Sequence, residues 1–324
     1  MVVAVTWDPG HTLPDAPACP VGSEDFVSAA GRSGRMLPPA VHDALVELQD
    51  SPPSSGALLI RHAPVGDLPA TPAEPSDHVD KARTSELTLL TIARRLGQPV
   101  GYLPEHGGDL VQNLVPTRAG AERQVSTSSR VDLEFHTETA FHPHAPRYLV
   151  LLCLRGDPQA RTTLCSVGDV LAVLDAGTVS VLRQPRFTCG VDESFLEGRP
   201  AGEGDTSVRT RSALGERGPL PVIGGTEERP TLWFDAELMR GTDVAAQAAL
   251  DQLSRAVQDN QISVVLEAGD CLVVDNTAAV HGRSSYAARF DGTDRWLQRA
   301  FVVPDLGPSA ADRDGRIIGT LFAV

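Results

Sequence analysis

The spacing of apolar residues predicts helices and one strand in the first hundred positions. Apolar side chains recur at helical intervals in 38–48, which opens with proline, and from about 77 to 96. Between them, the compact apolar run 57–61 predicts a buried strand. Residues 1–36 are rich in Gly, Pro, Ala and Ser and show little periodicity, so we expect them to be loosely packed.

The remainder of the chain has mostly the pattern of short strands separated by turns. Alternating or β-branched runs predict strands at 110–116, 147–155, 162–167, 179–183, 220–223, 231–235, 262–266, 271–275 and 296–303. One helix interrupts the series, with Thr242 as its cap and 245–257 as its body.

No internal repeat or long linker divides the chain, so we predict a single domain over 1–324. A helical, loop-rich part (about 1–100) is expected to pack on a β core (about 101–324). The fold class predicted from the pattern is therefore mainly β with flanking helices.

Composition narrows the partners and the compartment. A net charge of −14 over 324 residues argues against nucleic acid or an anionic membrane as partner. The five cysteines lack C-x-x-C spacing, which favours reduced thiols in a cytoplasmic protein. The N-terminus lacks the features of a signal peptide, and no stretch approaches the ~20 apolar residues that a membrane span needs. We expect a cytoplasmic protein; the sequence predicts no oligomeric state.

Three residues suggest a metal site. His136 and Glu138 are two positions apart, so in an extended segment their side chains point to one face. His281 follows the predicted strand 271–275. Two histidines and one carboxylate, with the remaining positions open, form the facial triad of non-heme Fe(II) oxygenases. A bare His-x-Glu also fits an ordinary surface strand with two polar residues, so the surrounding sequence decides.

That surrounding sequence resembles the clavaminate synthase-like 2-oxoglutarate oxygenases, which include asparagine oxygenases and the arginine and lysine hydroxylases of antibiotic pathways. Residues 136–144 (HTETAFHPH) resemble the family's iron-binding segment, and 279–283 (AVHGR) resembles the segment of its distal histidine. In this family two arginines follow that histidine by fourteen and eighteen residues, positions that Arg295 and Arg299 occupy here. The resemblance covers roughly residues 100–303.

The resemblance implies a double-stranded β-helix (jelly-roll) core with Fe(II) held by His136, Glu138 and His281. It further implies that Arg295 and Thr163 bind the cosubstrate 2-oxoglutarate, with Thr162 as the substitute if the register slips. Dioxygen (O2) is the remaining reactant.

The substrate implied by the resemblance is a small molecule, a free L-amino acid. Glu105 would bind its α-amino group, Arg299 its α-carboxylate, and Ser126 would also contact it. Asp235 and Glu237 match in type and spacing a pair of aspartates that bind guanidinium in the arginine hydroxylases. The expected activity is hydroxylation of arginine, lysine or a close analogue at C3 or C4 in natural-product biosynthesis.

Other functions remain open at this point. Hydroxylation of asparagine or another neutral amino acid would keep the chemistry and change the pocket. A non-enzymatic metal-binding jelly-roll would not need Arg295, and a zinc hydrolase gives no reason for the two arginines after His281. A halogenase is disfavoured because its halide takes the place of a carboxylate ligand, and Glu138 is present.

Overall fold

The computed structural model describes residues 1–197, 211–213 and 216–322, and within these ranges the strands form five sheets. Nine strands make up the largest sheet, in which β4 pairs with β17 beside the main order. That order is β1 (Val3–Thr6), β2 (Ala57–Arg61), β15 (Cys271–Asp275), β6 (Tyr148–Arg155), β17 (Trp296–Val303), β3 (Gln98–Tyr102), β19 (Ile317–Ile318) and β18 (Arg313–Asp314), and β4 is Gln112–Leu114.

A four-stranded sheet supplies much of the site described below. Its order is β14 (Ile262–Val265), β7 (Arg161–Ser166), β16 (Ala279–Arg283) and β5 (Leu133–His136). The smaller sheets are β10 (Glu216–Leu220), β8 (Phe187–Gly190) and β13 (Met239–Gly241); β11 (Ile223–Gly225) and β12 (Pro230–Leu232); and β20 (Thr320–Phe322) and β9 (Arg211–Ala213).

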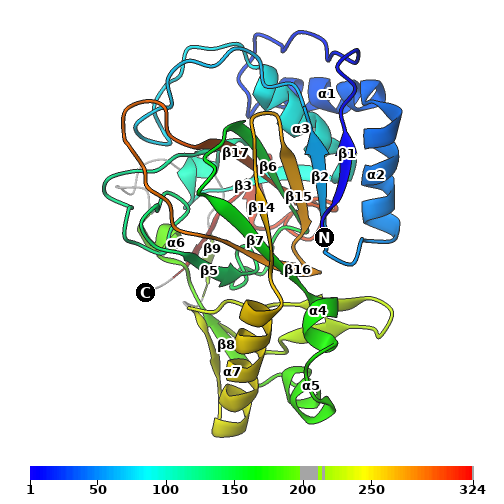
Figure 1. Ribbon diagram of the computed structural model, residues 1–324, viewed down its shortest axis with the longest axis vertical. Helices are drawn as coiled ribbons and strands as arrows, with labels where there is room; N and C mark the ends of the chain where they lie inside the picture. Colours follow the sequence, from blue (N-terminus) through cyan, green and yellow to red (C-terminus); the bar gives the residue numbers. More distant parts are fainter. Residues whose placement is uncertain (198–210, 214–215, 323–324) are drawn as a thin grey trace.

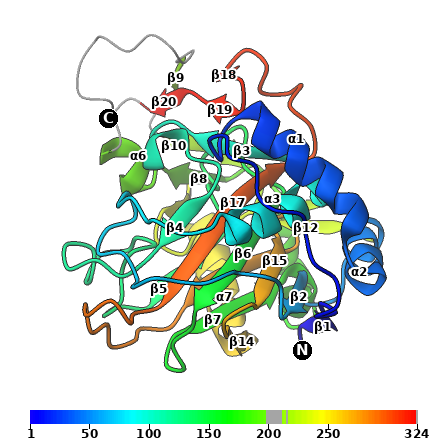
Figure 2. The same ribbon diagram turned by 90° about the horizontal axis from the view of Figure 1, so that it is seen from above.

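Most of the helices gather at two ends of the molecule (Figure 1). They are α1 (Glu24–Ser33), α2 (Pro39–Asp50), α3 (Thr84–Leu96), α4 (Val167–Leu171), α5 (Ala176–Leu182), α6 (Glu193–Glu197) and α7 (Val244–Asp259). α1, α2 and α3 lie beside β1 and β2, whereas α4, α5 and α7 lie at the opposite end. In Figure 2, α3 lies between α1 and the strands β17 and β6. None of the helices in the described ranges combines the length and apolar character that a bilayer crossing requires.

Alternate residues of the central strand β6 belong to two different cores. Val150, Leu152 and Leu154 pack with the apolar faces of α1–α3. Leu149 and Leu151 point the other way, into the core shared with the four-stranded sheet. Because both faces are covered, seven of the eight β6 residues are buried, and the strand reads as an almost unbroken apolar run. The cavity described below opens between these two sheets.

Several elements are confirmed where the apolar pattern is strong. β2, β15 and β17 cover the ranges predicted for them, and β6, β7 and β14 agree to within a residue or so. α2 begins at a proline, as expected. The mainly β architecture with flanking helices is also confirmed.

The expectation of loose packing over residues 1–36 is wrong. This segment contains β1 and α1, and the side chains of Trp7 and Phe26 are 1% and 0% exposed. The Ser23 side chain accepts a hydrogen bond from the Phe26 amide and so caps α1. A serine followed by two acidic residues is a helix-start signal, and it was present in the sequence although the apolar periodicity of this segment is weak.

Side-chain caps also account for two errors in helix and strand assignment. The predicted strand 179–183 lies largely in α5, because Oδ1 of Asp175 accepts from the amides of Gly177 and Thr178 and starts a helix. α7 is capped by Asp243 rather than Thr242, whose hydroxyl donates to the Arg186 carbonyl instead.

Four predicted elements also have wrong boundaries. α3 begins at Thr84 rather than near 77, because Asp77 closes a turn by accepting from the Glu74 amide at 2.9 Å. The strands expected at 110–116 and 231–235 shorten to β4 and β12. The expected strand 220–223 spans the end of β10 and the start of β11.

Candidate active site

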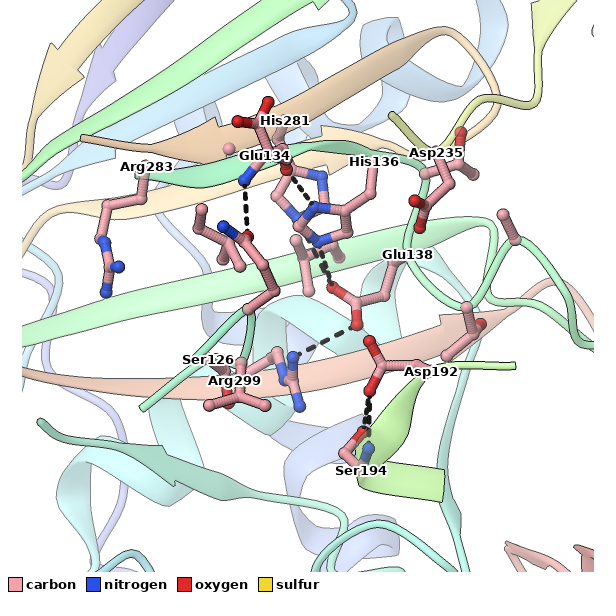
Figure 3. Close-up of a pocket in the computed structure, with 18 of the residues that line it drawn as sticks. Ser126, Glu134, His136, Glu138, Asp192, Ser194, Asp235, His281, Arg283 and Arg299 are labelled. Carbon is pink, nitrogen blue, oxygen red and sulfur yellow. Dashed lines mark hydrogen bonds and ion pairs between the residues drawn. The ribbon is translucent and has the colours of Figure 1, made fainter. Parts of the chain in front are cut away.

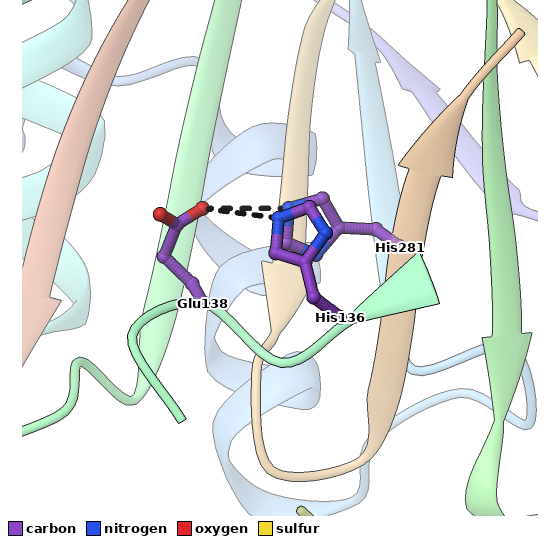
Figure 4. A group of neighbouring side chains, drawn as sticks. All are labelled: His136, Glu138 and His281. Carbon is purple, nitrogen blue, oxygen red and sulfur yellow. Dashed lines mark ion pairs between the residues drawn. The ribbon is translucent and has the colours of Figure 1, made fainter. Parts of the chain in front are cut away.

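Two histidines and a carboxylate meet at one point between the sheets (Figure 4). His136 ends β5, and its partner across the antiparallel pairing with β16 is His281. Glu138 lies beyond the strand, yet its Oε2 is 4.0 Å from Nε2 of His136 and 3.4 Å from Nε2 of His281. One ligand atom from each residue lies within 4.8 Å of the other two, so the three can hold a single metal ion.

Hydrogen bonding and burial prepare both imidazoles to act as ligands. Nδ1 of His136 lies 2.8 Å from the Glu134 carbonyl oxygen. Since a carbonyl only accepts, Nδ1 carries the proton and Nε2 keeps its lone pair for a metal. Burial, and then the neighbouring His136, lower the pKa of His281 to about 4. His281 is therefore neutral at pH 7, which is the form that binds a metal.

A buried arginine links Glu138 to a second acid. Arg299, in β17, forms ion pairs with Glu105 and, through Nη1 at 3.2 Å, with Oε1 of Glu138. Oε1 of Gln112 accepts from Nε and Nη2 of the same arginine, at 2.9 and 2.6 Å. Burial alone would raise the pKa of Glu138, but Arg299 together with His281 and His136 outweighs it and holds the pKa well below its usual range.

Glu105 shows the opposite balance. Burial raises its pKa despite the ion pair with Arg299, and its buried Oε2 has no hydrogen-bond partner among the described residues. From the sequence, Glu105 was expected to bind the α-amino group and Arg299 the α-carboxylate of one amino acid substrate. The structure brings these two side chains into contact beside the proposed metal ligand Glu138.

A second arginine of the cavity has no partner among the residues that the structure describes. Arg295 is 6% exposed, and in the described part of the chain its guanidinium makes no hydrogen bond or ion pair. Arg283, by contrast, is fully engaged: it donates to the carbonyl and hydroxyl of Ser128 and to the Val131 carbonyl. Burial, and then Arg295, lower the pKa of Arg283 to about 10, so the two cations are near each other. A buried cation without a counter-charge is suited to bind an anion.

The threonine that lines the arginine end of the cavity is one position away from Thr163, the residue that was predicted. Thr162 is 3% exposed and lines the cavity, whereas Thr163 is not among the lining residues. Successive side chains of a strand point to opposite faces, so only one of the two can face the cavity. Oγ1 of Thr163 lies instead against Gly282 of the paired strand β16. Of the two threonines, Thr162, the expected substitute, is therefore the one that faces the cavity.

Carboxylates gather at the other end of the cavity. Oδ1 of Asp235 accepts from the amides of Glu237 and Leu238 at 2.9 and 2.7 Å, which fixes its orientation. Asp192 is held in the turn before α6, where its Oδ1 accepts from the amide and hydroxyl of Ser194. Burial, and then Asp235 and Asp192, raise the pKa of Glu237. These acids are thus close enough to repel one another.

The arginines, the His/Glu/His group and the acidic side chains line one cavity, which is positively charged at one end and negatively charged at the other. In Figure 3, Arg283 lies at one end and Asp235 at the other, with His136 and His281 between them. Together with its open mouth, the space between the lining residues measures about 1060 Å³. All the predicted site residues except Thr163 line it: Glu105, Ser126, His136, Glu138, Asp235, Glu237, His281, Arg295 and Arg299.

Sequence reasoning missed Asp192, and its surroundings explain why. It is followed by Ser194 at the start of a five-residue helix, an arrangement that reads as an ordinary helix-start turn. Only the tertiary structure brings this turn beside Asp235.

Comparison with known proteins agrees with this geometry. Residues 56–301 match the family described as taurine catabolism dioxygenase TauD, TfdA family, and the chain belongs to that family. It is 38% identical over 305 residues to an L-lysine 3-hydroxylase of Catenulispora acidiphila, covering 93% of this chain and 82% of the relative.

Two solved structures show the same fold along the whole chain. One is asparagine oxygenase in complex with Fe(II), 2S,3S-3-hydroxyasparagine and succinate, with a TM-score of 0.86, 31% identity and 99% of each chain covered. The other is the non-heme iron oxygenase OrfP in complex with Fe, succinate and (3S)-hydroxy-L-Arg, with a TM-score of 0.84, 28% identity and 98% and 99% coverage.

These findings confirm the resemblance to the asparagine oxygenase and amino acid hydroxylase group, and with it an iron- and 2-oxoglutarate-dependent dioxygenase. The alternatives of a non-enzymatic metal-binding protein and a zinc hydrolase are thereby set aside.

Proposed function

We propose that this enzyme hydroxylates a free basic L-amino acid, arginine, lysine or a close analogue, at C3 or C4. The observation that carries the proposal is the charge pattern of one cavity. A cation without a partner in the described ranges lies at one end and a group of carboxylates at the other, with the His/Glu/His group between them. It is supported by the relatives named L-lysine 3-hydroxylase and L-ornithine/L-arginine 3-hydroxylase and by the OrfP structure in complex with (3S)-hydroxy-L-Arg.

His136, Glu138 and His281 are the iron ligands in this proposal. The donor set fits the metal, because Fe(II) accepts imidazole and carboxylate and the three residues occupy only one face of its coordination sphere. Bound iron and 2-oxoglutarate supply the oxidising power that converts a C–H bond to C–OH, with 2-oxoglutarate and dioxygen consumed and succinate and carbon dioxide released. We also propose that the two larger sheets form the double-stranded β-helix that the family resemblance implies.

Arg295 and Thr162 hold the distal carboxylate of 2-oxoglutarate. The fit rests on the protein itself: the Arg295 guanidinium is buried and pairs with no carboxylate of the described residues, and Thr162 faces the same cavity. A guanidinium can bind a carboxylate through two parallel hydrogen bonds. The cosubstrate therefore satisfies a cation that the protein leaves unpaired.

The α-amino and α-carboxylate groups of the substrate exchange partners with an internal ion network. Without substrate, Arg299 pairs with Glu105 and Glu138. A zwitterionic amino acid brings a carboxylate for Arg299 and an ammonium for Glu105, whose Oε2 has no partner in the part of the chain that the structure describes. Each charge thus keeps a partner, with Ser126 beside it as a further contact in the cavity. An amino acid that lacks either α-group leaves part of this exchange incomplete and binds poorly.

The side chain of the substrate points to the acidic end. Asp192, Asp235 and Glu237 repel one another across this end, and a guanidinium or ammonium relieves that repulsion. The protein then holds the substrate at both ends and places one C–H bond of the carbon chain beside the iron, which supplies the orientation that catalysis requires.

The second candidate is hydroxylation of asparagine. It is favoured by the similarity to asparagine oxygenase over 99% of the chain. A neutral side chain, however, would leave the mutual repulsion of the acids at this end unrelieved.

A substrate panel separates the two candidates. The enzyme with Fe(II), 2-oxoglutarate and air is given L-arginine, L-lysine, L-ornithine or L-asparagine, and mass spectrometry follows the gain of one oxygen. The proposal expects product with the basic amino acids and much less with asparagine. Nα-acetyl-lysine, which lacks the α-ammonium, is the control and should give none. Product from asparagine alone would replace the proposed substrate class by the second candidate.

A further inference from the structure

One buried amide binds both backbone groups of Glu138. Asn276 is 0% exposed, and its Oδ1 accepts from the Glu138 amide at 2.7 Å. Its Nδ2 donates to the Glu138 carbonyl at 3.1 Å and to the Pro146 carbonyl at 3.0 Å. The side chain therefore pairs with Glu138 as a neighbouring strand would, and each of its hydrogen-bonding atoms is used.

This contact lies where regular structure no longer supports the chain. The pairing of β5 with β16 ends at His136, so no strand ladder holds the backbone of Glu138. The next residue, Thr139, adopts a left-handed conformation with φ of 50°, which is uncommon for a β-branched side chain. A turn of this kind persists when its surroundings over-determine it.

Asn276 also connects the two chain segments that supply the metal ligands. It follows β15 directly and precedes His281 by five residues, while its own amide donates to the Arg147 carbonyl at 2.9 Å. Glu138 belongs to the segment after β5, and His281 to β16. The amide therefore fixes the position of the carboxylate relative to the strand that carries the distal histidine.

We propose that Asn276 is a positioning residue that holds Glu138 in place as a metal ligand. The inference rests on the proposed iron site. It attributes part of the affinity for Fe(II) to a residue that is not itself a metal ligand. Groups that orient metal ligands typically change metal affinity by about 10–100-fold when they are removed. An amide side chain is required here, because a single planar group must accept one hydrogen bond and donate two.

The test measures metal binding without catalysis. Fe(II) is titrated anaerobically into the apo-protein of the wild type, Asn276→Ala and Asn276→Asp. The aspartate variant nearly keeps the shape of the side chain but turns an oxygen toward two carbonyls, so it decides the matter if the alanine variant does not fold. Thr277→Ala is the neighbouring control, since its hydroxyl donates only to Asp275, at 2.7 Å. Leu45→Ala, in the core around α2, is the control for a general loss of stability.

The expected result is about 10–100-fold weaker Fe(II) binding in both Asn276 variants, with near wild-type binding in the two controls. The ratio of 2-oxoglutarate consumed to product formed should rise in the same variants, because a displaced carboxylate misaligns the reaction. Wild-type affinity in Asn276→Asp, or an equal loss in Leu45→Ala, would overturn the inference. Failure of the wild type itself to bind Fe(II) would instead refute the proposed iron site.

Discussion

Replacing Arg295 by methionine tests the cosubstrate site without disturbing the rest of the cavity. Because the guanidinium has no partner among the described residues, its removal leaves no protein group unsatisfied. It also relieves the repulsion of Arg283, whose pKa Arg295 lowers. Methionine keeps most of the apolar stem packed. The free energy of unfolding of the apo-protein should therefore be unchanged or higher.

Cosubstrate binding should respond very differently. A bidentate guanidinium–carboxylate contact contains two charge-assisted hydrogen bonds, each worth about 1.5–3 kcal/mol. Their loss of about 3–6 kcal/mol corresponds to 2-oxoglutarate binding that is weaker by about 10²–10⁴-fold, at 1.4 kcal/mol per decade. Lysine at this position keeps the charge but not the paired geometry, so Arg295→Lys should lie between the two.

The assay is an anaerobic titration of 2-oxoglutarate into the Fe(II) enzyme, combined with thermal unfolding of the apo-protein. Arg161→Met removes one positive charge from an exposed position and serves as the control for net charge. A 2-oxoglutarate Kd in Arg295→Met within about threefold of wild type, with Fe(II) binding intact, would refute the assigned role. A clear loss of apo-protein stability would refute the statement that this cation is unpaired.

Three further predictions follow from the same cavity. Asp235→Asn should raise the KM for arginine or lysine by about 10–100-fold, the cost of one charge-assisted hydrogen bond, and leave any asparagine turnover unchanged in steady-state kinetics. Arg299→Met should destabilise the apo-protein by about 3–5 kcal/mol in urea unfolding, because it leaves the Glu138 carboxylate buried without its partner; an unchanged midpoint would contradict this. Burial lowers the pKa of His281 to about 4 and that of His142 to about 3, from 6.5. At these two histidines the unfolded chain binds more protons in this range, so they should lower the free energy of unfolding as the pH drops from about 6.5 to 4, whereas Glu105, whose pKa burial raises to about 7, acts in the opposite direction. The fall should therefore be steeper in Glu105→Gln than in the wild type, and a flat profile in that variant would count against neutral histidines.

The parts of the fold that could be predicted are those whose burial requires a regular pattern of apolar residues in the sequence. β15 and β17 are buried on both faces, so their apolar runs are continuous and their ends are sharp. The errors fall where a single side chain decides the outcome. Asp175 converts a β-branched run into α5, and Ser23 starts a helix in a segment without clear periodicity.

The site divides in a similar way. His136 and Glu138 could be paired because their relation is local, and the arginines were placed through their distance from His281. The one-residue difference between Thr162 and Thr163 reverses the face of a strand, and spacing alone does not determine which face is inside.

Contacts that depend on tertiary structure left no local signal. Asp192 joins the acidic end only because the turn before α6 lies against the cavity. Asn276 likewise meets Glu138 across 138 positions of the chain.

The most direct test of the central claim is an anaerobic titration followed by visible spectroscopy. Fe(II) and 2-oxoglutarate are added to the apo-protein to produce a metal-to-ligand charge-transfer band, and individual L-amino acids are then added. The account predicts a band that arginine or lysine perturbs and asparagine does not. A band that only neutral amino acids perturb would contradict the role of the acidic end, and the absence of any band would contradict the proposed iron and cosubstrate site.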